Sequence, residues 1–333
     1  MKTRILAIVF AFFLAAGAAD RAWGWNDRGH MTVACIAYQQ LTPATKARVN
    51  VLLKLNPFYD RWAAAVPASV SAADKDMIIF MLAALWADEI KGEPGFITDG
   101  SDNGNRPDGS PDPNKNTGYD DMLRHKYRHF IDTAFSTPDG LALPPVPTPN
   151  VQNSIALFRG VVASTDPDPK KSYDLSWLLH LVGDIHQPLH ATARVTSALP
   201  KGDSGGNLVT LTCTGCPKEL HMYWDDLLGV TTKLAAPPPE KGMPDAKSLR
   251  AILSAAKKLP AADATEAAKS SEAVWAQESF DAAKLTVYPG LVANADGSSS
   301  LTPAYKKAAA KLAQKRVALA GARLANLLNN ELK

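Results

Sequence analysis

The stretch SYDLSWLLHLVGDIHQPLH, which begins at Ser172 and ends at His190, decides the fold of this chain. Its apolar residues keep helical spacing and Pro188 ends the pattern, so the stretch predicts a helix that begins at Ser172. His180 and Asp184 lie four residues apart, and this spacing places both side chains on one face of the predicted helix. His190 follows just after the helix end. The stretch therefore brings three side chains of metal-binding type to one region.

A second pair with the same spacing, His221 and Asp225, lies where the sequence predicts a helix over Glu219–Leu228. A single pair of this kind is more often a hydrogen bond on a helix surface than a metal site. Two pairs with His190 between them favour metal binding, because imidazole and carboxylate groups are ligands that hold zinc in proteins. The chain has only seven histidines, so the grouping does not come from abundance.

Helix signals dominate the rest of the chain. Capping residues, prolines in first turns and apolar periodicity predict further helices over Ala44–Leu55, over 71–88 and from Thr302-Pro303 to the end. Only Asn207–Cys213 alternates like a strand. No linker separates two apolar halves, so the sequence predicts one mainly α domain with a short β-hairpin.

Residues Gly92–Gly118 break the helical pattern. They are rich in Gly, Asp, Asn and Pro and almost lack apolar residues, so they predict a long surface loop. The run Asp102–Asn105 loosely resembles a calcium-binding loop. The alternating acidic positions and the final Glu of such loops are missing, which favours a solvated loop.

Residues 1–24 predict a secretory signal peptide. A basic start is followed by the apolar run Ile5–Ala19, which is short for a membrane span, and then by small residues at alternate positions. We therefore expect a soluble protein that is secreted or periplasmic. The precursor has 36 basic and 33 acidic residues, and removal of residues 1–24 leaves 33 and 32. A nearly neutral protein can bind nucleic acid only through a local site.

The three cysteines are too few for a disulfide scaffold. Cys213 and Cys216 form either a local disulfide or half of a zinc site, and the lack of a second half favours the disulfide. Cys35 has no partner in this interpretation.

Six motifs follow one another along the chain: Trp25-Asn-Asp-Arg-Gly-His30, Trp86-Ala-Asp88-Glu, His129-Phe-Ile-Asp132, His180-x-x-x-Asp184-Ile-x-Gln-Pro-Leu-His190, Gly205-Gly-Asn207 and His221-x-x-Trp-Asp225. This series resembles the S1/P1 nuclease family, the zinc-dependent single-strand nucleases of fungi, plants and bacteria. The resemblance covers residues 25–333. It implies a single-domain helical fold of the phospholipase C and S1/P1 nuclease type, in which Gly92–Gly118 is an insertion.

The resemblance also implies three zinc sites. One zinc is bound by Asp88, His129, His180 and Asp184. A second is bound by His190, His221 and Asp225. The third is bound by the α-amine and carbonyl oxygen of Trp25, by His30 and by a shared Asp184. His125 and His186 have no role in this scheme, and His186 is expected to be a core or supporting residue.

The implied activity is hydrolysis of single-stranded DNA and RNA to 5′-phosphorylated products, with 3′-nucleotidase activity. Catalysis is assigned to Asp88, Asp184 and Lys91, although Lys91 stands where many relatives carry Arg and lacks its two-pronged hydrogen bonding. Phe130 is expected to stack on an unpaired base, with Asp132 and Asn207 near the base edge. The alternative for Phe130 is a core position.

Two other functions fit part of the pattern. A zinc phospholipase C shares the implied fold and metals, but Asp225 stands where those enzymes use Glu, and the His129–Asp132 motif is intact. A non-catalytic exported zinc carrier explains the ligands but not the aromatic residue beside them, and such carriers usually have His-rich tracts. We therefore expect a monomeric nuclease whose substrates are single-stranded nucleic acid and nucleotides.

The sequence also predicts where the signal peptide is removed. Ala22-Trp23-Gly24 places small residues at the positions that signal peptidase reads, so cleavage is expected between Gly24 and Trp25. A backbone amide nitrogen does not bind zinc at neutral pH. An α-amine, with a pKa of about 8, loses its proton once a metal is near. Cleavage is thus expected to create a metal ligand.

Overall fold

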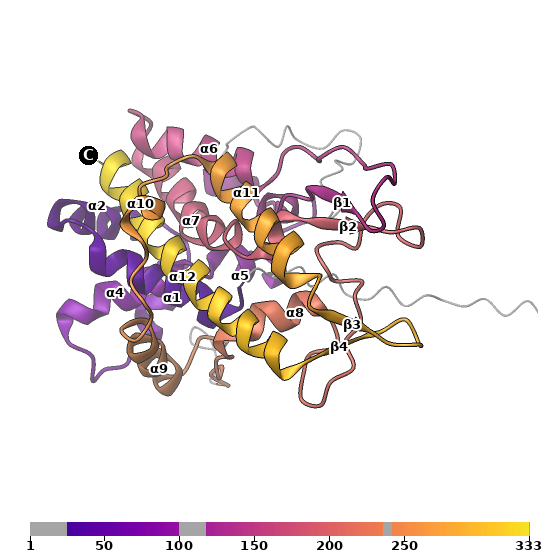
Figure 1. Ribbon diagram of the computed structural model, residues 1–333. Coiled ribbons are helices and arrows are strands. Elements are labelled where there is room, and N and C mark those ends of the chain that lie inside the picture. Colours follow the sequence, from indigo (N-terminus) through magenta and orange to yellow (C-terminus); the bar gives the residue numbers. More distant parts are fainter. Residues whose placement is uncertain (1–24, 100–117, 236–241, 333) are drawn as a thin grey trace, which may run out of the picture.

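The computed structural model describes residues 25–99, 118–235 and 242–332 (Figure 1). The α-helices are α1 (Asp27–Gln40), α2 (Pro43–Leu53), α3 (Tyr59–Ala65), α4 (Ala72–Ala83), α5 (Trp86–Gly92), α6 (Val151–Ala163), α7 (Asp168–Asp184), α8 (Leu220–Asp225), α9 (Ala246–Ala256), α10 (Ala264–Ala267), α11 (Glu272–Ala282) and α12 (Pro303–Glu331). Short 3-10 turns are η1 (Gly118–Asp121), η2 (Lys126–His129), η3 (Pro188–Ala191) and η4 (Asp226–Leu228), and η5 (Ala283–Val287) is a π-helical turn. The mainly helical fold predicted from the sequence is confirmed.

Side-chain caps explain where several helices begin. The hydroxyl of Thr42 accepts a hydrogen bond from the Thr45 backbone nitrogen at the start of α2, and Thr302 does the same for Tyr305 at the start of α12. Proline follows each threonine and its fixed φ suits the first helical turn. The α12 prediction is therefore confirmed, and α2 ends two residues earlier than predicted.

Helix α7 lies at the centre of the helical body (Figure 1). Every residue from Ser172 to Asp184 is buried. The helix packs against α1, α2, α6 and α12, and the Trp177 ring contacts the rings of Phe158 and Trp86 at centroid distances of 6.0 and 5.5 Å. A helix that is buried on all sides can hold polar side chains only if they have partners.

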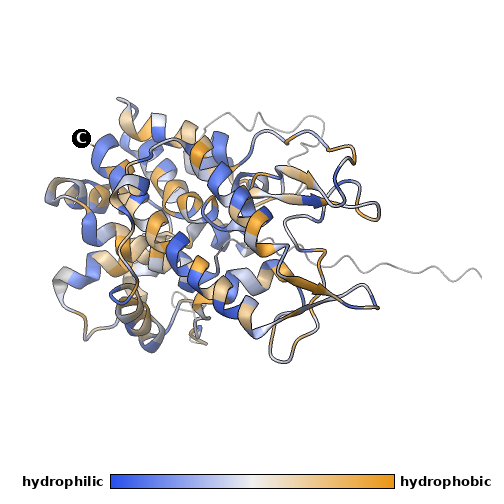
Figure 2. Cartoon of the chain, viewed as in Figure 1, coloured by the Kyte–Doolittle hydropathy of each residue, from blue (hydrophilic) through white to orange (hydrophobic). Residues whose placement is uncertain are grey.

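Hydrophobic and hydrophilic residues are mixed along the helices around α7. Figure 2 shows hydrophobic and hydrophilic residues side by side along helices such as α11 and α12. Among the described helices, none combines the length and apolar composition that crossing a bilayer requires.

Other predicted helix boundaries were also wrong. Helix α7 begins at Asp168 rather than Ser172, because Pro169 suits the first turn and extends the helix toward the N-terminus. The predicted helix over 71–88 is divided into α4 and α5 by a tight turn in which the Leu85 nitrogen donates to the Leu82 carbonyl. The break leaves the Ala84 carbonyl oxygen available to accept a 2.7 Å hydrogen bond from His180 Nδ1.

The predicted segment Glu219–Leu228 is also divided, into α8 and the 3-10 turn η4. α8 begins at Leu220 and ends at Asp225, so the pair His221 and Asp225 still lies on one helix. Gly229 follows with a positive φ of 87°, as expected for a residue that ends a helical segment.

Two small sheets lie at one end of the helical body (Figure 1). β1 (Ala134–Ser136) pairs in parallel with β2 (Ala193–Val195), and β3 (Leu291–Ala293) forms an antiparallel hairpin with β4 (Ser299–Leu301). A short β-hairpin is present as expected, but it lies at Leu291–Leu301 and not at the segment predicted as a strand.

The strand predicted over Asn207–Cys213 was wrong. Thr210 and Leu211 make only isolated bridges, to Glu219 and Ser299 respectively. Cys213 and Cys216, which are joined by a disulfide as predicted, lie in the tight turn after this segment. Among the described residues, the chain that returns from the turn bonds to it only through Leu211 to Lys218 and Leu220 to Val209, because α8 begins at Leu220.

The predicted loop Gly92–Gly118 lies partly outside the described residues. Its described flank contains Asp99, and the chain after it contains Asp121 and His125. The His125 imidazole lies between these carboxylates, with Nδ1 2.5 Å from Asp99 Oδ2 and Nε2 2.9 Å from Asp121 Oδ2. The hydroxyl groups of Tyr127 and Tyr173 donate to the same two carboxylate oxygens. His125 therefore joins the two flanks of the loop.

This contact changes how the protein responds to acid. Burial would raise the pKa of Asp99 and of Asp121, but the facing His125 lowers both below the ordinary 3.8. Carboxyl groups with lowered pKa values stabilise the fold above their ordinary pKa, and this contribution is lost as the pH falls through their folded values.

We predict that His125→Gln lowers the free energy of unfolding by roughly 1.5–3 kcal/mol near pH 6, because it removes the imidazole between two buried carboxylates, which keep the hydroxyls of Tyr127 and Tyr173 as donors. The difference from the unmodified protein should shrink as the pH falls below about 3.8, where the carboxyl groups take up protons. Urea denaturation at pH 6 and pH 3 measures both effects. Lys170→Gln, which breaks an exposed ion pair with Asp166, is the control and should cost less than about 1 kcal/mol. Equal losses in the two variants would contradict the prediction.

Candidate metal centre

Eight buried side chains from six elements meet beside the C-terminal end of α7. They form three groups in which the ligand atoms lie within 4.8 Å of one another: His30, His180 and Asp184; Asp88, His129 and His180; His190, His221 and Asp225. All eight are at most 3% exposed. The structure thus brings together every predicted metal-binding side chain, from α1, α5, η2, α7, η3 and α8.

The Asp184 carboxylate lies between two of these groups. Its Oδ1 atom is 3.3 Å from His30 Nε2, while its Oδ2 atom is 2.9 Å from His129 Nδ1 and 3.2 Å from His180 Nε2. One carboxylate that faces two sets of imidazoles with different oxygens has the arrangement of a bridging ligand.

Small residues allow the first group to form. A Cβ atom on Gly183 would lie 2.8 Å from His30 Nδ1, so only glycine lets the His30 ring approach α7. The His30 ring stacks on the His180 ring at 3.7 Å. A Cβ atom on Gly29 would lie 2.5 Å from the Trp25 Cβ atom, so the fully buried Trp25 side chain also depends on a glycine.

Backbone carbonyl groups fix the orientation of three of the imidazoles. The Nδ1 atoms of His180, His190 and His221 lie 2.7 Å from the carbonyl oxygens of Ala84, His129 and Gly205. A carbonyl oxygen only accepts, so each Nδ1 carries the proton and each Nε2 presents a lone pair to the site. Such carbonyl or carboxylate partners are typical of histidines that bind metals.

The third group shows the need for a cation most directly. The Nε2 atoms of His190 and His221 are 3.1 Å apart, and two lone pairs at this distance repel each other unless a proton or a metal ion lies between them. Asp225 completes the group, with Oδ2 3.6 Å from His221 Nε2 and Oδ1 accepting a 2.8 Å hydrogen bond from Gln187.

Several polar atoms in the other groups are buried without a hydrogen-bond partner. They include Asp88 Oδ2, His180 Nε2 and Asp184 Oδ1. Buried polar atoms in proteins are almost always bonded, and imidazole with carboxylate is the donor set of zinc. The residues of the three groups therefore fit zinc ions.

Burial and neighbouring charges shift the pKa values of several of these side chains. Burial and the nearby Lys91 lower the pKa of His129 to about 3, which keeps its imidazole neutral as a ligand must be. Burial would raise the pKa of Asp184, but His180 and His190 hold it well below its ordinary value. Burial raises the pKa of Asp225 well above its ordinary value, and the nearby carboxylates of Asp226 and Asp184 raise it further, while the hydrogen bond from Gln187 lowers it.

Lys91 lies beside the metal groups. Its Nζ atom donates to Asp88 Oδ1 at 2.6 Å, three residues earlier on α5. The positive charge predicted to lie near a phosphate is therefore held against one of the candidate metal ligands.

The three residues predicted to contact substrate are chain neighbours of residues that bond to the third group, since Ile131 bonds to His190 and Gly205 bonds to His221. Phe130 is half-buried and, among the described residues, belongs to neither of the two hydrophobic clusters. The Ile131 nitrogen donates to the His190 carbonyl at 2.7 Å, which fixes the chain beside Phe130. Asn207 is partly exposed and lies two residues after Gly205, the partner of His221. Burial and the nearby Asp203 raise the pKa of Asp132 to about 7.

Some functional partners were not predicted. Gln187 donates a hydrogen bond to Asp225. Its position inside the His180–His190 motif was the sequence feature that could have indicated this role. The roles of the Ala84 and Gly205 carbonyl groups could not be predicted from the sequence, since every residue has a backbone carbonyl. His186 is a buried core residue as predicted: its Nδ1 lies 2.7 Å from the Val182 carbonyl oxygen, and Arg323 bonds its Nε2 at 3.0 Å.

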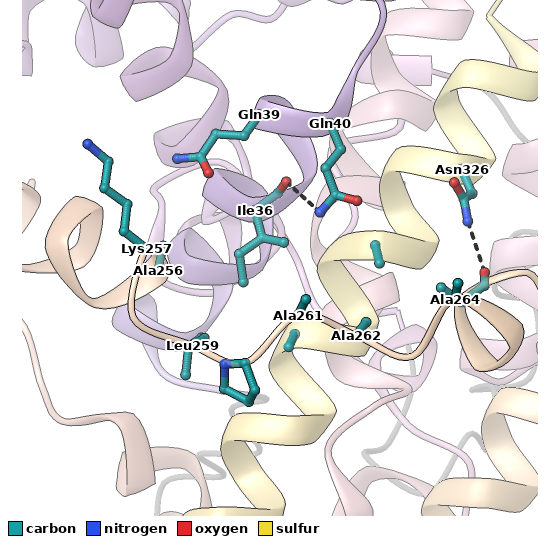
Figure 3. Close-up of a pocket in the computed structure, with 14 residues that line it drawn as sticks. Ile36, Gln39, Gln40, Ala256, Lys257, Leu259, Ala261, Ala262, Ala264 and Asn326 are labelled. Atoms are coloured by element: carbon teal, nitrogen blue, oxygen red, sulfur yellow. Dashed lines mark hydrogen bonds between the residues drawn. The ribbon is translucent and has the colours of Figure 1, made fainter.

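A separate cavity of about 720 Å³ lies away from these groups, between α1, the chain that follows α9, and α12 (Figure 3). It is lined mainly by small apolar side chains, with Gln39, Gln40, Lys257 and Asn326 as its polar residues. None of the metal-group residues lines it, so it is not the candidate site.

A buried cluster of three histidine–aspartate groups in a helical body is a site that can bind metal ions. The sequence profile of the S1/P1 Nuclease family matches residues 25–333, so the chain belongs to the S1/P1 nuclease family. A search among curated proteins found no match. The chain is therefore a nuclease of a family of zinc enzymes, and three groups of its side chains can bind metal.

We predict that Asp184→Asn removes at least one zinc ion per chain and lowers the melting temperature of the zinc-saturated protein, because it takes away a carboxylate that faces two groups. Zinc content by mass spectrometry after gel filtration measures the loss. Asp174→Asn is the matched control, since Asp174 is a buried aspartate of α7 outside the metal groups. Retention of all zinc in Asp184→Asn would show that this carboxylate is not shared.

Proposed function

We propose that the protein is an exported zinc-dependent endonuclease. It hydrolyses single-stranded DNA and RNA to 5′-phosphorylated products and also acts on 3′-nucleotides. The observation that supports this most strongly is the position of Asp184 between two groups of imidazoles, with a third group and the half-buried Phe130 close by.

The chain offers ligands for three zinc ions. Trp25, His30 and Asp184 hold one. Asp88, His129, His180 and Asp184 hold another, and His190, His221 and Asp225 hold the third. When bound, zinc ions activate water at moderate pH and offset negative charge on the attacked phosphate and the leaving oxygen.

The side chains around these groups bind and orient the substrate. The Phe130 ring stacks on a base, which requires that the base be unpaired, and this gives the preference for single strands. Asp132 and Asn207 hydrogen-bond the base edge. Lys91, next to Asp88, adds a positive charge beside the phosphate. Gln187 and the Gly205 carbonyl hold Asp225 and His221 of the third group in place.

We also propose that residues 1–24 direct export and are removed before Trp25. Support comes from the composition of this segment and from the family match, which begins at residue 25. Removal would give Trp25 an α-amine, which binds zinc where an amide nitrogen does not.

A digest of one oligonucleotide as single-stranded DNA, as RNA and as a duplex tests the activity. We expect the single strands to be cut, the duplex to be resistant, the products to carry 5′-phosphates, and a chelator to abolish cleavage. Phe130→Leu should reduce single-strand turnover by roughly 5- to 150-fold with zinc content unchanged, because base stacking contributes about 1–3 kcal/mol.

Phe135→Leu is the control for Phe130. Phe135 is buried and packs on Phe280 and Tyr288, so its loss should lower stability instead of turnover. Equal cutting of duplex and single strands, or equal effects of the two variants, would argue against a stacking platform.

We predict that one additional alanine before Trp25 removes one zinc ion per chain and most of the activity, because the Trp25 nitrogen becomes an amide. The measurement is zinc content of the extended and the processed protein, with the N-terminus of each confirmed by sequencing. Full zinc content and activity in the extended protein would refute a role for the Trp25 amine.

A further inference from the structure

The residue after Trp25 is held by a segment that is distant in sequence. Asn26 Nδ2 donates to Asp226 Oδ1 at 2.7 Å and to the Gly229 carbonyl at 2.9 Å. The Asn26 backbone nitrogen donates to the Asp225 carbonyl at 3.4 Å. Asn26 therefore makes three hydrogen bonds to the end of α8 and to η4, the segment that carries a ligand of the third metal group.

The side-chain oxygen of Asn26 caps the start of α1. Asn26 Oδ1 accepts from the Arg28 nitrogen at 3.0 Å and from the Gly29 nitrogen at 3.2 Å, so Asn26 is the N-cap of the helix that carries His30. Because both ends of the amide are bonded, the side chain cannot rotate without losing contacts on both sides. Asn26 thus joins the start of α1 to the segment that contains Asp225.

Asp27 makes a weaker contact with the chain just after that segment. Its carboxylate pairs with Lys233 and accepts a 3.4 Å hydrogen bond from the Thr231 hydroxyl. The Lys233 side chain is 49% exposed, and exposed ion pairs contribute little. The bonds of Asn26 are therefore the main connection.

The Trp25 backbone is fixed from both sides. Its side chain is fully buried and packs directly on Gly29, and its Cδ1 atom lies 3.8 Å from the position of a Cβ atom on Gly183. On the other side, the peptide bond leads to Asn26. With the ring and the next residue both held, the Trp25 nitrogen has little freedom.

We propose that Asn26 is a positioning residue that fixes the Trp25 nitrogen at the His30–Asp184 group by joining α1 to the segment Asp226–Gly229. This inference rests on the proposed function, in which that nitrogen binds zinc. A ligand that is held in place before the metal arrives loses less conformational entropy on binding, so the affinity for that zinc is higher.

Asn26→Ser separates positioning from capping. Serine is as good an N-cap as asparagine, but its hydroxyl is too short to reach Asp226 and Gly229 while it caps. We expect one of three zinc ions to bind roughly tenfold to a hundredfold more weakly, with the other two unchanged and the melting temperature of the metal-free protein close to that of the unmodified chain. Zinc titration against a competing chelator measures this, on protein whose first residue is confirmed as Trp25.

Two controls make the test specific. Asp263→Ser changes the N-cap of α10, a helix that carries no residue of the metal groups, and should leave all three affinities unchanged. When Asn26→Ser is combined with an additional alanine before Trp25, it should have no further effect on the two remaining zinc ions, because the ligand that it positions is already lost.

The outcomes distinguish this inference from the proposed function. If the unmodified protein binds three zinc ions and Asn26→Ser binds all three equally well, Asn26 does not position a ligand. The same conclusion follows if all three ions weaken together as the melting temperature falls, since that indicates a general structural role. If the unmodified protein binds fewer than three zinc ions, the proposed metal sites fail and this inference fails with them.

Discussion

The fold depends on how it accommodates five histidines and three aspartates that are buried together. Removing this many polar groups from water is costly unless each has a partner. Asp184 is the centre of the arrangement, since its two oxygens face imidazoles of different groups. Zinc ions in the three groups would supply the missing partners, so metal binding and folding are expected to be coupled.

Other features of the structure follow from this constraint. The break between α4 and α5 exposes the Ala84 carbonyl to His180, and the positive φ of Gly205 places its carbonyl against His221. Gly183 lets the His30 ring approach α7. Each is a local departure from regular or crowded structure, and each serves to orient an imidazole.

The sequence predicted the ligands better than the elements that carry them. The prediction that His180 and Asp184 lie on one helix face is correct although the predicted helix start was wrong, because it requires only that the turn between the two residues be helical. Helix α7 was recognised, but α1, α6, α9 and α11 were not, although the N-cap residues Asn150 and Asp245 precede two of them. The break at Ala84, the two-sided role of Asn26 and the contact of His125 with Asp99 depend on residues far apart in sequence, which spacing cannot show.

The central claim is that one carboxylate joins two of three zinc sites. Crystals of the protein that begins at Trp25, grown with zinc and measured on both sides of the zinc absorption edge, test it most directly. The account predicts three anomalous peaks per chain, two of them on opposite oxygens of Asp184 and the third among His190, His221 and Asp225. A single peak, or three peaks of which none contacts Asp184, would contradict it.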